Sequence, residues 1–359
     1  MTGPVHHRSY GFSGPVREPI LQIHPSLRCN LSCRHCYSSS GPLVRLELDV
    51  TTVCSAVSDA AEMGYKVVSI SGGEPFMYAG LTQVLSHAKS LGMRTTVTTN
   101  GYFLQLGRLI AVRDFLDVLA ISLDGPPELH NHMRGSPRAF ERLATGLPAL
   151  RDADLRFGFI HTLTQNTWEH LLWVADFAAA NGASLLQIHP LELSGRAQDQ
   201  MRSDAPEEDV LAKAYLLTFA IACKYPDMGL QCDLLHRNDV LDDPQLIYAS
   251  ELDKAALRST KAADLLGLIV VEANGIVVPI SYGFSRDYQL CNLHEQRLRE
   301  AWPEYLESRY LTFRQLCRQL FEDLIGLSDS GLFNWYELIV AYGRRVGPSV
   351  LARRKLAAV

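Results

Sequence analysis

The sequence predicts an α/β protein, a partial (β/α)6 TIM-like barrel followed by a smaller C-terminal α+β module. Short apolar runs rich in β-branched residues recur over the first 200 residues, as in parallel strands that are buried on both faces. Each run is followed by a stretch with helical periodicity, which predicts right-handed crossovers and a parallel sheet. Six strands are fewer than the eight of a closed barrel, so we expect an open cleft.

The expected strands are Leu21–Leu27, Val67–Ser71, Thr95–Thr99, Val118–Leu123, Phe157–Leu163 and Leu185–Leu191. Four helices are expected between them from apolar stripes: Asp49 to Gly64, Leu81 to Gly92, one opened by Ser136-Pro137, and Thr167 to Gly182. Asp49 suits an N-cap and Pro137 suits a first helical position, whereas the glycines suit helix ends. The alternation along the strands decides whether His24, His161 and His189 face inward.

After residue 200 the pattern changes. A helix is expected over 204–225, an irregular stretch over Arg237–Lys261, and a hairpin over Leu268–Ile280, whose two β runs surround Ala-Asn-Gly. We therefore expect an N-terminal extension (1–19), a barrel (20–225), a second module (226–325) and a helical, basic C-terminal tail (326–359). Tyr282 and Asp287, beside the hairpin, are candidate pocket residues.

Composition narrows the class of protein. The 359 residues are 47% hydrophobic and 20% charged, and 34 basic against 39 acidic residues give a net charge of −5. This charge argues against a protein that binds nucleic acid through its phosphates. No apolar run reaches the ~20 residues of a membrane span, and the N-terminus does not resemble a signal peptide. Eight cysteines are too few for a disulfide scaffold, so clustered ones indicate metal or redox chemistry in a cytoplasmic enzyme.

Three of the cysteines are closely spaced. Cys29, Cys33 and Cys36 follow the first expected strand, at the end of a barrel where enzymes place their chemistry. Three thiolates without a fourth nearby suit an iron–sulfur cluster with one iron left open. A zinc site, which wants a fourth ligand, and three incidental buried cysteines are the alternatives.

The spacing and position of these cysteines resemble the radical S-adenosylmethionine (SAM) enzymes. The resemblance covers residues 20–200 and continues more faintly to about 310. It implies a 4Fe–4S cluster held by Cys29, Cys33 and Cys36, with SAM bound to the open iron. It also implies reductive cleavage of SAM to a 5′-deoxyadenosyl radical, which abstracts hydrogen from a substrate.

Further matches to this family follow successive strands. They are the segments Gly72-Gly73-Glu74-Pro75, Thr98-Thr99-Asn100-Gly101 and Ser122-Leu123-Asp124-Gly125, then Arg134 and Leu191. The resemblance implies that Gly72 and Gly73 allow close approach of the backbone and that Glu74 binds the ammonium group of SAM. It implies further SAM contacts for Asn100, Ser122 and Arg134, the last as a carboxylate partner. The backbone of His35 and the side chain of Leu191 are implied to contact the adenosyl group.

Residues 268–308 resemble the start of the auxiliary-cluster (SPASM or twitch) domain of peptide-modifying relatives. The cluster ligands are missing, because Pro279-Ile280-Ser281 and Gln296 stand where cysteines are expected, and Cys291 replaces a glycine. We therefore expect a single cluster and a reaction that is redox-neutral or that returns its electron to that cluster. A site built from Cys223, Cys232, Cys291 and Cys317, or a redox-active thiol among them, is the alternative.

The resemblance leaves the substrate open. A ribosomally synthesised peptide, crosslinked or otherwise modified on a side chain, is the first expectation. A small molecule or cofactor precursor, such as a tetrapyrrole side chain, is the alternative, and a non-catalytic iron–sulfur or zinc protein is a distant one. The expected partners are an electron donor, such as flavodoxin or ferredoxin, and a separate peptide-recognition protein, because the first 20 residues are too few for a leader-binding domain.

Overall fold

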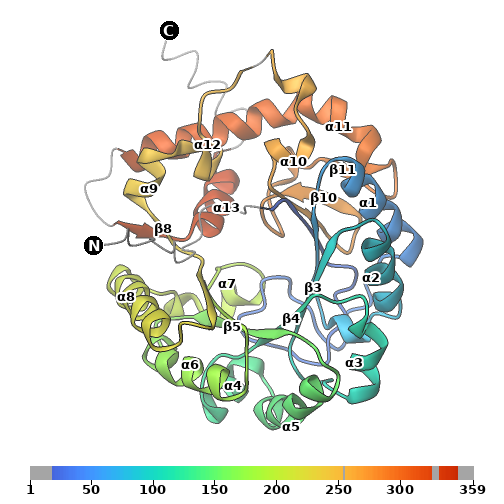
Figure 1. Ribbon diagram of the computed structural model, residues 1–359. Helices are drawn as coiled ribbons and strands as arrows, with labels where there is room; N and C mark the ends of the chain where they lie inside the picture. Colours follow the sequence, from blue (N-terminus) through green and yellow to red (C-terminus); the bar gives the residue numbers. More distant parts are fainter. Residues whose placement is uncertain (1–17, 254, 326–330, 347–359) are drawn as a thin grey trace, which may run out of the picture.

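The computed structural model describes residues 18–253, 255–325 and 331–346. A ten-stranded sheet runs in the order β11-β10-β9-β1-β2-β3-β4-β5-β6-β7, and helices surround it in Figure 1. Six neighbouring parallel strands confirm the expected barrel: β1 (Ile20–Ile23), β2 (Val67–Ile70), β3 (Arg94–Thr99), β4 (Val118–Ser122), β5 (Phe157–Leu163) and β6 (Leu185–Pro190).

Two strands differ from expectation. β1 ends at Ile23 and not at Leu27, because Pro25 has no backbone N–H to continue a ladder and the chain turns away there. β7 (Gly229–Cys232) is parallel to β6, although its Gly-Leu-Gln-Cys sequence lacks the β-branched residues that marked the other strands. The sheet thus continues beyond residue 225, where the sequence places the end of the barrel. The domain limits remain a prediction.

Eight helices of the described structure accompany these strands. They are α1 (Val50–Glu62), α2 (Leu81–Ser90), α3 (Leu106–Arg113), α4 (Pro127–Arg134), α5 (Ala139–Asp152), α6 (Leu171–Ala180), α7 (Arg196–Gln200) and α8 (Glu208–Lys224). Asp49 caps α1 as expected, since its carboxylate accepts a hydrogen bond from the Thr52 amide at 2.9 Å. α5 begins at Ala139, two residues after Pro137, and a 3-10 turn (Trp168–His170) precedes α6.

The two faces of the barrel strands differ in character. Outward residues such as Leu21, Leu119 and Ile188 are fully buried in the main core. The inward face is half-buried and is largely small or polar: Gln22, Ser69, Thr96, Thr98, Ala120, Ser122, Thr162, Gln187 and His189. Because bulky branched residues fill an ordinary TIM barrel, this inner face lines a polar interior, which we call the lumen.

The alternation also places the three histidines. His189 shares the inward face of β6 with Gln187, and His24 follows the inward Gln22, which lies 3.2 Å away between side-chain nitrogens. His161 lies on the outward face of β5, where its Nδ1 is 3.2 Å from the Leu123 carbonyl oxygen. His24 and His189 therefore face the lumen and His161 does not.

The rest of the described chain forms a second unit beside β1. It contains β8 (Leu235–His236), α9 (Arg237–Asp242), α10 (Ala262–Leu265), β9 (Leu268–Val271), β10 (Ile276–Pro279), β11 (Cys291–Asn292), α11 (Leu298–Glu307), α12 (Arg309–Ile325), β12 (Leu332–Phe333) and α13 (Trp335–Arg345). β9 and β10 form the expected hairpin, and β9 is hydrogen-bonded in parallel to β1. In the stretch expected to be irregular, α9 and two 3-10 turns are present.

Aromatic packing fills the core of the second unit. The buried rings that contact one another there are Phe284, Tyr288, Tyr305, Tyr310 and Phe313. Cys317 lies fully buried on α12, whereas Cys223 is exposed on α8, so these cysteines are not gathered at one site. Within the described ranges, no three His, Cys, Asp or Glu side chains, those of Cys29, Cys33 and Cys36 included, are arranged to hold a single metal ion.

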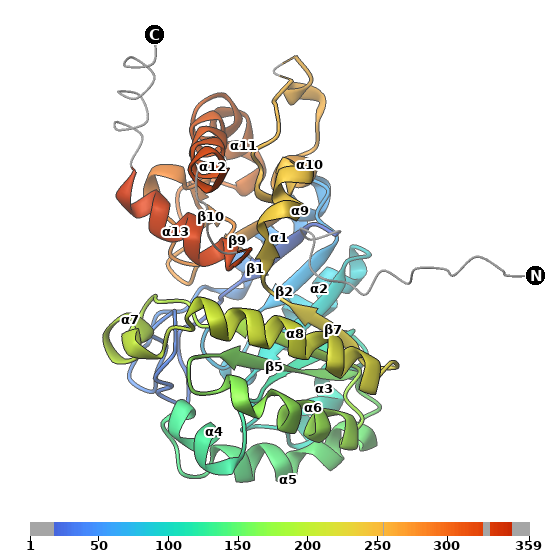
Figure 2. The ribbon, with the colours of Figure 1, turned by 90° about the vertical axis from the view of Figure 1, so that its left-hand side faces the viewer.

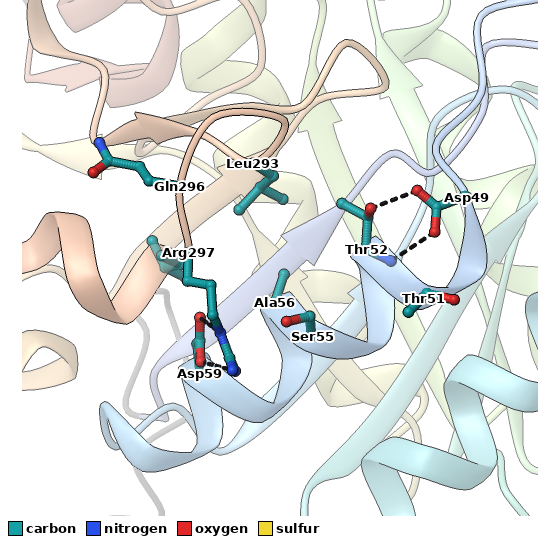
Figure 3. Close-up of a pocket in the computed structure, with 10 residues that line it drawn as sticks. Asp49, Thr51, Thr52, Ser55, Ala56, Asp59, Leu293, Gln296 and Arg297 are labelled. Atoms are coloured by element: carbon teal, nitrogen blue, oxygen red, sulfur yellow. Dashed lines mark hydrogen bonds and ion pairs between the residues drawn. The ribbon is translucent and has the colours of Figure 1, made fainter.

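An ion pair between a buried aspartate and an exposed arginine joins the second unit to the barrel. Asp59 of α1 is 1% exposed and accepts hydrogen bonds from Arg297, at 3.2 Å from Nε and 2.5 Å from Nη2 (Figure 3). Thr51, Thr52 and Ser55 line the groove above this pair. No helix of the described ranges could span a membrane, and the tail beyond Val346 lies outside those ranges.

Candidate active site

The three closely spaced cysteines lie in a loop between β1 and α1, which we call the cysteine loop (residues 28–41). It begins and ends with backbone hydrogen bonds, from the Cys29 amide to the Gly41 carbonyl (3.2 Å) and from the Gly41 amide to the Leu27 carbonyl (3.1 Å). Cys29 and Cys33 are 7% exposed, and Cys36 is half-buried. These free thiols pack with Leu31 and Tyr102 in one small apolar cluster.

Three glycines allow other loops to press against the cysteine loop. A Cβ on Gly73, after β2, would lie 2.1 Å from the Arg28 carbonyl oxygen. One on Gly135, after α4, would lie 2.9 Å from the Ser32 oxygen, and one on Gly195, after β6, would lie 2.3 Å from the Tyr37 oxygen. All three distances are shorter than a van der Waals contact. Gly72 (φ 104°) approaches the Ser26 oxygen in the same way.

Hydrogen-bond donors surround the sulfur atoms. The Leu31 amide lies 3.4 Å from Cys29 Sγ, Asn100 Nδ2 lies 3.7 Å from the same atom, and Arg134 Nη1 lies 4.0 Å from Cys33 Sγ. Burial raises the pKa of Cys29 to about 12, so its thiol is neutral until a metal displaces the proton. Donors to the sulfurs are what protein-bound iron–sulfur clusters use to tune their potential.

The residues present also fit a polar ligand beside these thiols. Three buried polar atoms on or against the cysteine loop have no partner in the described structure: Asn30 Nδ2, His35 Nδ1 and Arg196 Nη2. Buried donors of this kind are normally satisfied. A polar group bound at the loop would satisfy them.

Glu74 is held rigidly at the end of β2. Its Oε1 accepts hydrogen bonds from Thr99 Oγ1 (2.8 Å) and the Phe76 amide (3.1 Å), and its Oε2 accepts one from the Asn100 amide (2.9 Å). Burial raises its pKa, although these donors oppose the shift. The carboxylate keeps acceptor capacity for an ammonium group, but its implied contact with SAM stays a prediction.

Arg134 is paired within the chain. Its Nε and Nη2 donate to the two oxygens of Asp124, at 2.7 and 3.0 Å, in a bidentate geometry. Both residues are buried, and the Arg134 guanidinium holds the pKa of Asp124 well below its usual range. Nη1 remains directed at Cys33. The sequence indicated Arg134 but not this pairing, and its contact with a SAM carboxylate stays a prediction.

The other expected ligands surround the same loop. Asn100 directly follows β3 and donates to Asn30 Oδ1 at 2.9 Å. Ser122 ends β4 on its inward face, and His35 is half-buried within the cysteine loop, where burial lowers its pKa to about 4. Leu191 follows β6, buried in a small cluster with Met133, Ala197 and Met201. The structure brings the expected residues together, and their individual roles stay predictions.

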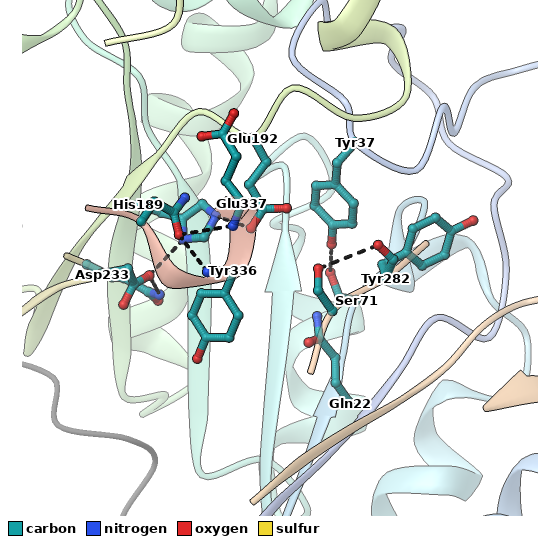
Figure 4. A network of polar contacts seen from close by, with 12 residues as sticks. Gln22, Tyr37, Ser71, His189, Glu192, Asp233, Tyr282, Tyr336 and Glu337 are labelled. Atoms are coloured by element: carbon teal, nitrogen blue, oxygen red, sulfur yellow. Dashed lines mark hydrogen bonds and ion pairs between the residues drawn. The ribbon is translucent and has the colours of Figure 1, made fainter. Parts of the chain in front are cut away.

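A second polar group, which the sequence did not indicate as a set, lines the lumen at β6 and β7 (Figure 4). His189 Nδ1 lies 2.8 Å from Asp233 Oδ2, and its Nε2 lies 3.2 Å from Glu192 Oε1. Gln187 Nε2 also donates to Asp233 Oδ2, at 2.6 Å, and Gln231 Nε2 donates to Asp233 Oδ1, at 2.7 Å. We call His189, Glu192, Asp233 and Glu337 the carboxylate wall. Its two carboxylate partners raise the pKa of His189 to about 10 against the effect of burial.

α13 completes this wall from the far end of the chain. Glu337 accepts a hydrogen bond from the Leu193 amide, and its pKa is raised by burial and by the charge of Glu192. Tyr336 lies beside it, and Arg344 Nη2 lies 3.4 Å from Ser194 Oγ. Figure 2 shows α13 above α7, which begins one residue after Gly195. A sequence signal for this contact is absent, because more than 140 residues separate Glu192 from Glu337.

Comparisons with known proteins agree with this site. Residues 23–178 match the radical SAM superfamily. This segment is a radical SAM domain. It is 24% identical over 298 residues to the Fe-coproporphyrin III synthase of Methanosarcina barkeri, covering 80% of this chain and 74% of the relative. It is 29% identical over 222 residues to mycofactocin maturase MftC of Mycobacterium tuberculosis, covering 60% and 56%.

A solved structure shows the same fold. SuiB of Streptococcus suis bound to precursor peptide SuiA matches with a TM-score of 0.64 at 17% identity, over 83% of this chain and 67% of SuiB. This radical SAM enzyme therefore uses a 4Fe–4S cluster and SAM, which together supply a 5′-deoxyadenosyl radical when bound. The free thiols of Cys29, Cys33 and Cys36 fit the cluster, and the unpartnered atoms beside them fit SAM.

Three rings of this radical SAM enzyme connect the cysteine loop to the second unit. His24 stacks on Tyr282 with centroids 4.7 Å apart, and Tyr37, next to Cys36, lies 5.7 Å from both rings. Burial lowers the pKa of His24 to about 3, so its ring is neutral and accepts or donates single hydrogen bonds. Tyr282 is thus at the lumen as expected, whereas Asp287 is exposed on a surface turn.

Proposed function

We propose that this radical SAM enzyme modifies a ribosomally synthesised peptide, by a crosslink or another change to a side chain. The observation that carries the proposal is the charge of the carboxylate wall. The wall holds three carboxyl groups, on Glu192, Asp233 and Glu337, against one basic side chain, His189, which lies between Glu192 and Asp233. A peptide can supply a lysine, an arginine or a terminal ammonium group to this wall.

The lumen favours a peptide over a tetrapyrrole. Tetrapyrrole precursors such as coproporphyrin carry several carboxylates, and like charges repel strongly where solvent is excluded. Among the lumen-facing strand residues of the described structure, the cations are His189, which lies between two carboxylates, and Arg94, which lies at the amino end of β3 paired with Glu18. At the carboxyl ends, where chemistry takes place, the inward side chains are hydroxyls, amides and the wall.

A tetrapyrrole precursor is the second candidate. The observation in its favour is the likeness to the Fe-coproporphyrin III synthase, which extends over 80% of this chain and so reaches beyond β7 into the second unit. The mycofactocin maturase matches over less of the chain. For either substrate, we propose that Glu74, Asn100, Ser122 and Arg134 orient SAM, that the backbone of His35 and the side chain of Leu191 hold its adenosyl group, and that Gly72 and Gly73 keep the backbone close.

The cellular location and the protein partners are proposed from the same chemistry. We propose a cytoplasmic oxidoreductase with one cluster, supplied with electrons by a flavodoxin or ferredoxin, and served by a separate peptide-recognition protein if the precursor needs one. The limits 1–19, 20–225, 226–325 and 326–359 are proposed as its functional divisions. The aromatic core of the second unit supports the single cluster, because Phe284 and its neighbours pack that core with side chains.

The test is anaerobic reconstitution followed by reduction with SAM and one of two substrates. The first is a synthetic peptide that contains lysine and arginine, and the second is an iron tetrapyrrole that is a precursor of iron-coproporphyrin III, the product for which the relative is named. We expect 5′-deoxyadenosine and a peptide that has lost two hydrogen atoms or changed a side chain, as read by mass spectrometry. Conversion of the tetrapyrrole to iron-coproporphyrin III, with the peptide unchanged, would establish the second candidate and exclude the first.

A further inference from the structure

A surface patch beside the cysteine loop combines exposed leucines with arginines. Leu43 is 90% exposed and Leu46 is 44% exposed, and Arg28 and Arg45 are exposed beside them. The four residues are adjacent because Leu27 donates its amide to the Leu46 carbonyl (3.0 Å) and Cys29 donates its amide to the Gly41 carbonyl (3.2 Å). We call Arg28, Leu43, Arg45 and Leu46 the loop patch.

The arginines of the loop patch have no carboxylate partner in the described part of the chain. Arg45 Nη1 donates only to its own segment, to the Pro42 and Val44 carbonyls. In the second unit, by contrast, five arginines are paired with carboxylates: Arg258–Glu307, Arg286–Glu272, Arg297–Asp59, Arg299–Glu62 and Arg318–Glu322. Glu47 is the one carboxylate of the segment 41–47. The patch is therefore locally basic on a chain whose net charge is −5.

The patch lies beside the cysteine loop, because Arg28 directly precedes Cys29 and the segment 41–46 is hydrogen-bonded to Leu27 and Cys29. Ser32, between Cys29 and Cys33, is exposed, so the loop itself reaches the surface. On the other side of the loop, Tyr102 packs against the cysteines, and the guanidinium of Arg142 lies 5.4 Å from the centroid of its ring. In Figure 2 this loop lies at the outside of the barrel beside α7.

We propose that the loop patch is the docking surface for a small acidic one-electron carrier protein of the flavodoxin type. The carrier loses one electron and the cluster held by the cysteines gains it, with no proton transfer and no bond formed. Charge complementarity steers the carrier to Arg28 and Arg45, and the exposed Leu43 supplies the apolar contact that a bare charged surface lacks. The proposal depends on the cluster chemistry of the superfamily and on no particular substrate.

The first readout is binding. A purified flavodoxin is titrated calorimetrically into the reconstituted full chain at low and at physiological salt. We expect binding that weakens with salt, since exposed charges are screened over about 8–10 Å, and at least tenfold weaker binding for Arg45→Glu and for Leu43→Ser. Arg151→Glu, an exposed residue at the end of α5, is the matched control and should bind as the unmodified chain does. Equal affinity of all four proteins, or no binding at low salt, overturns the proposal.

The second readout separates docking from damage to the site. With dithionite as reductant, Arg45→Glu and Leu43→Ser should form 5′-deoxyadenosine at the rate of the unmodified chain. With reduced flavodoxin, their rate should fall at least tenfold. A flavodoxin-supported rate that is unchanged, or one that falls only in step with the dithionite rate, overturns the proposal. If the unmodified chain makes no 5′-deoxyadenosine with dithionite, it is the catalytic function that fails.

Discussion

The cysteine loop and the carboxylate wall differ in how their charges are balanced. Around the cysteine loop Glu74 and Asp124 each accept two or more hydrogen bonds from within the chain, and Arg134 is paired in bidentate geometry. At the wall, Asp233 and Glu192 share the single cation His189, and Glu337 adds a further carboxylate. The charged side chains around the cysteine loop are thus balanced by partners within the chain. The second leaves charge for the substrate to neutralise.

The difference also lies in where the residues come from. The cysteine loop and its supports lie within residues 24–201, on consecutive strand–helix units. The wall draws on β6, on the residues after β6 and β7, and on α13 at the far end of the described chain. Variants can test whether the first region governs SAM chemistry and the second governs the substrate.

The largest effect is expected for Cys33→Ala. Removing one of three thiolates should reduce iron from about four per chain to less than one and abolish 5′-deoxyadenosine, as measured by iron analysis and chromatography. Cys223→Ala, at an exposed position on α8, is the control and should keep both. Seven or more irons in the unmodified chain would contradict the expectation of a single cluster.

Gly73→Ala should damage the cysteine loop without removing a ligand. Its new methyl group would meet the Arg28 carbonyl at 2.1 Å, and overpacking of this kind costs about 1–3 kcal/mol. We expect a lower melting temperature and less iron retained on gel filtration. Gly107→Ala, in α3 with open space around it, should instead stabilise the helix by about 1 kcal/mol. Full iron content in Gly73→Ala would show that the close approach is not needed.

Asp233→Asn should affect the substrate and leave SAM chemistry intact. Asp233 fixes His189 and raises its pKa, and a hydrogen bond to a charged group contributes about 1.5–3 kcal/mol. Since 1.4 kcal/mol corresponds to tenfold, product formation should fall about 10- to 100-fold. Reductive cleavage of SAM without substrate should stay within twofold. Equal loss of both rates would place the wall in the SAM site.

The same histidine gives a pH dependence of stability. The pKa of His189 is about 10 in the folded chain and near 6.5 when unfolded. Its stabilisation is complete below pH 6.5 and is lost as pH rises towards 10, because the folded form binds the extra proton in that window. The free energy of unfolding of the unmodified chain should therefore fall, relative to that of His189→Gln, between about pH 6.5 and pH 10. Urea titrations at several pH values in this window measure it, and a constant difference contradicts it.

Local patterns in the sequence predict the cysteine loop but not the carboxylate wall. The spacing of Cys29, Cys33 and Cys36 and the segment around Glu74 lie at strand ends, so the topology of a parallel sheet alone brings them together. Asp233 follows a strand too short and too polar to recognise, and Glu337 reaches the lumen only through packing of α13. Likewise, the spacing indicates Arg134 but cannot indicate its bidentate pairing with Asp124, which depends on the turn before α4.

The smallest effect is expected at the ion pair that fastens the second unit to the barrel. Asp59→Asn removes the buried charge that Arg297 contacts. Because the Arg297 side chain is exposed to solvent, which screens the pair, we expect only a small decrease in the urea midpoint. Glu307→Gln, which breaks the exposed pair with Arg258, is the matched control and should leave the urea midpoint unchanged, since exposed pairs contribute little.

Asp59→Asn should affect substrate binding at the wall more than SAM chemistry at the cysteine loop. Because β9 to α13 belong to the second unit, loosening this pair should disturb Glu337 and the wall before it disturbs the cysteine loop. Iron content should therefore stay at the level of the unmodified chain, whereas the Michaelis constant for substrate should rise. A loss of iron with an unchanged Michaelis constant would show that the second unit supports the cysteine loop and not the wall.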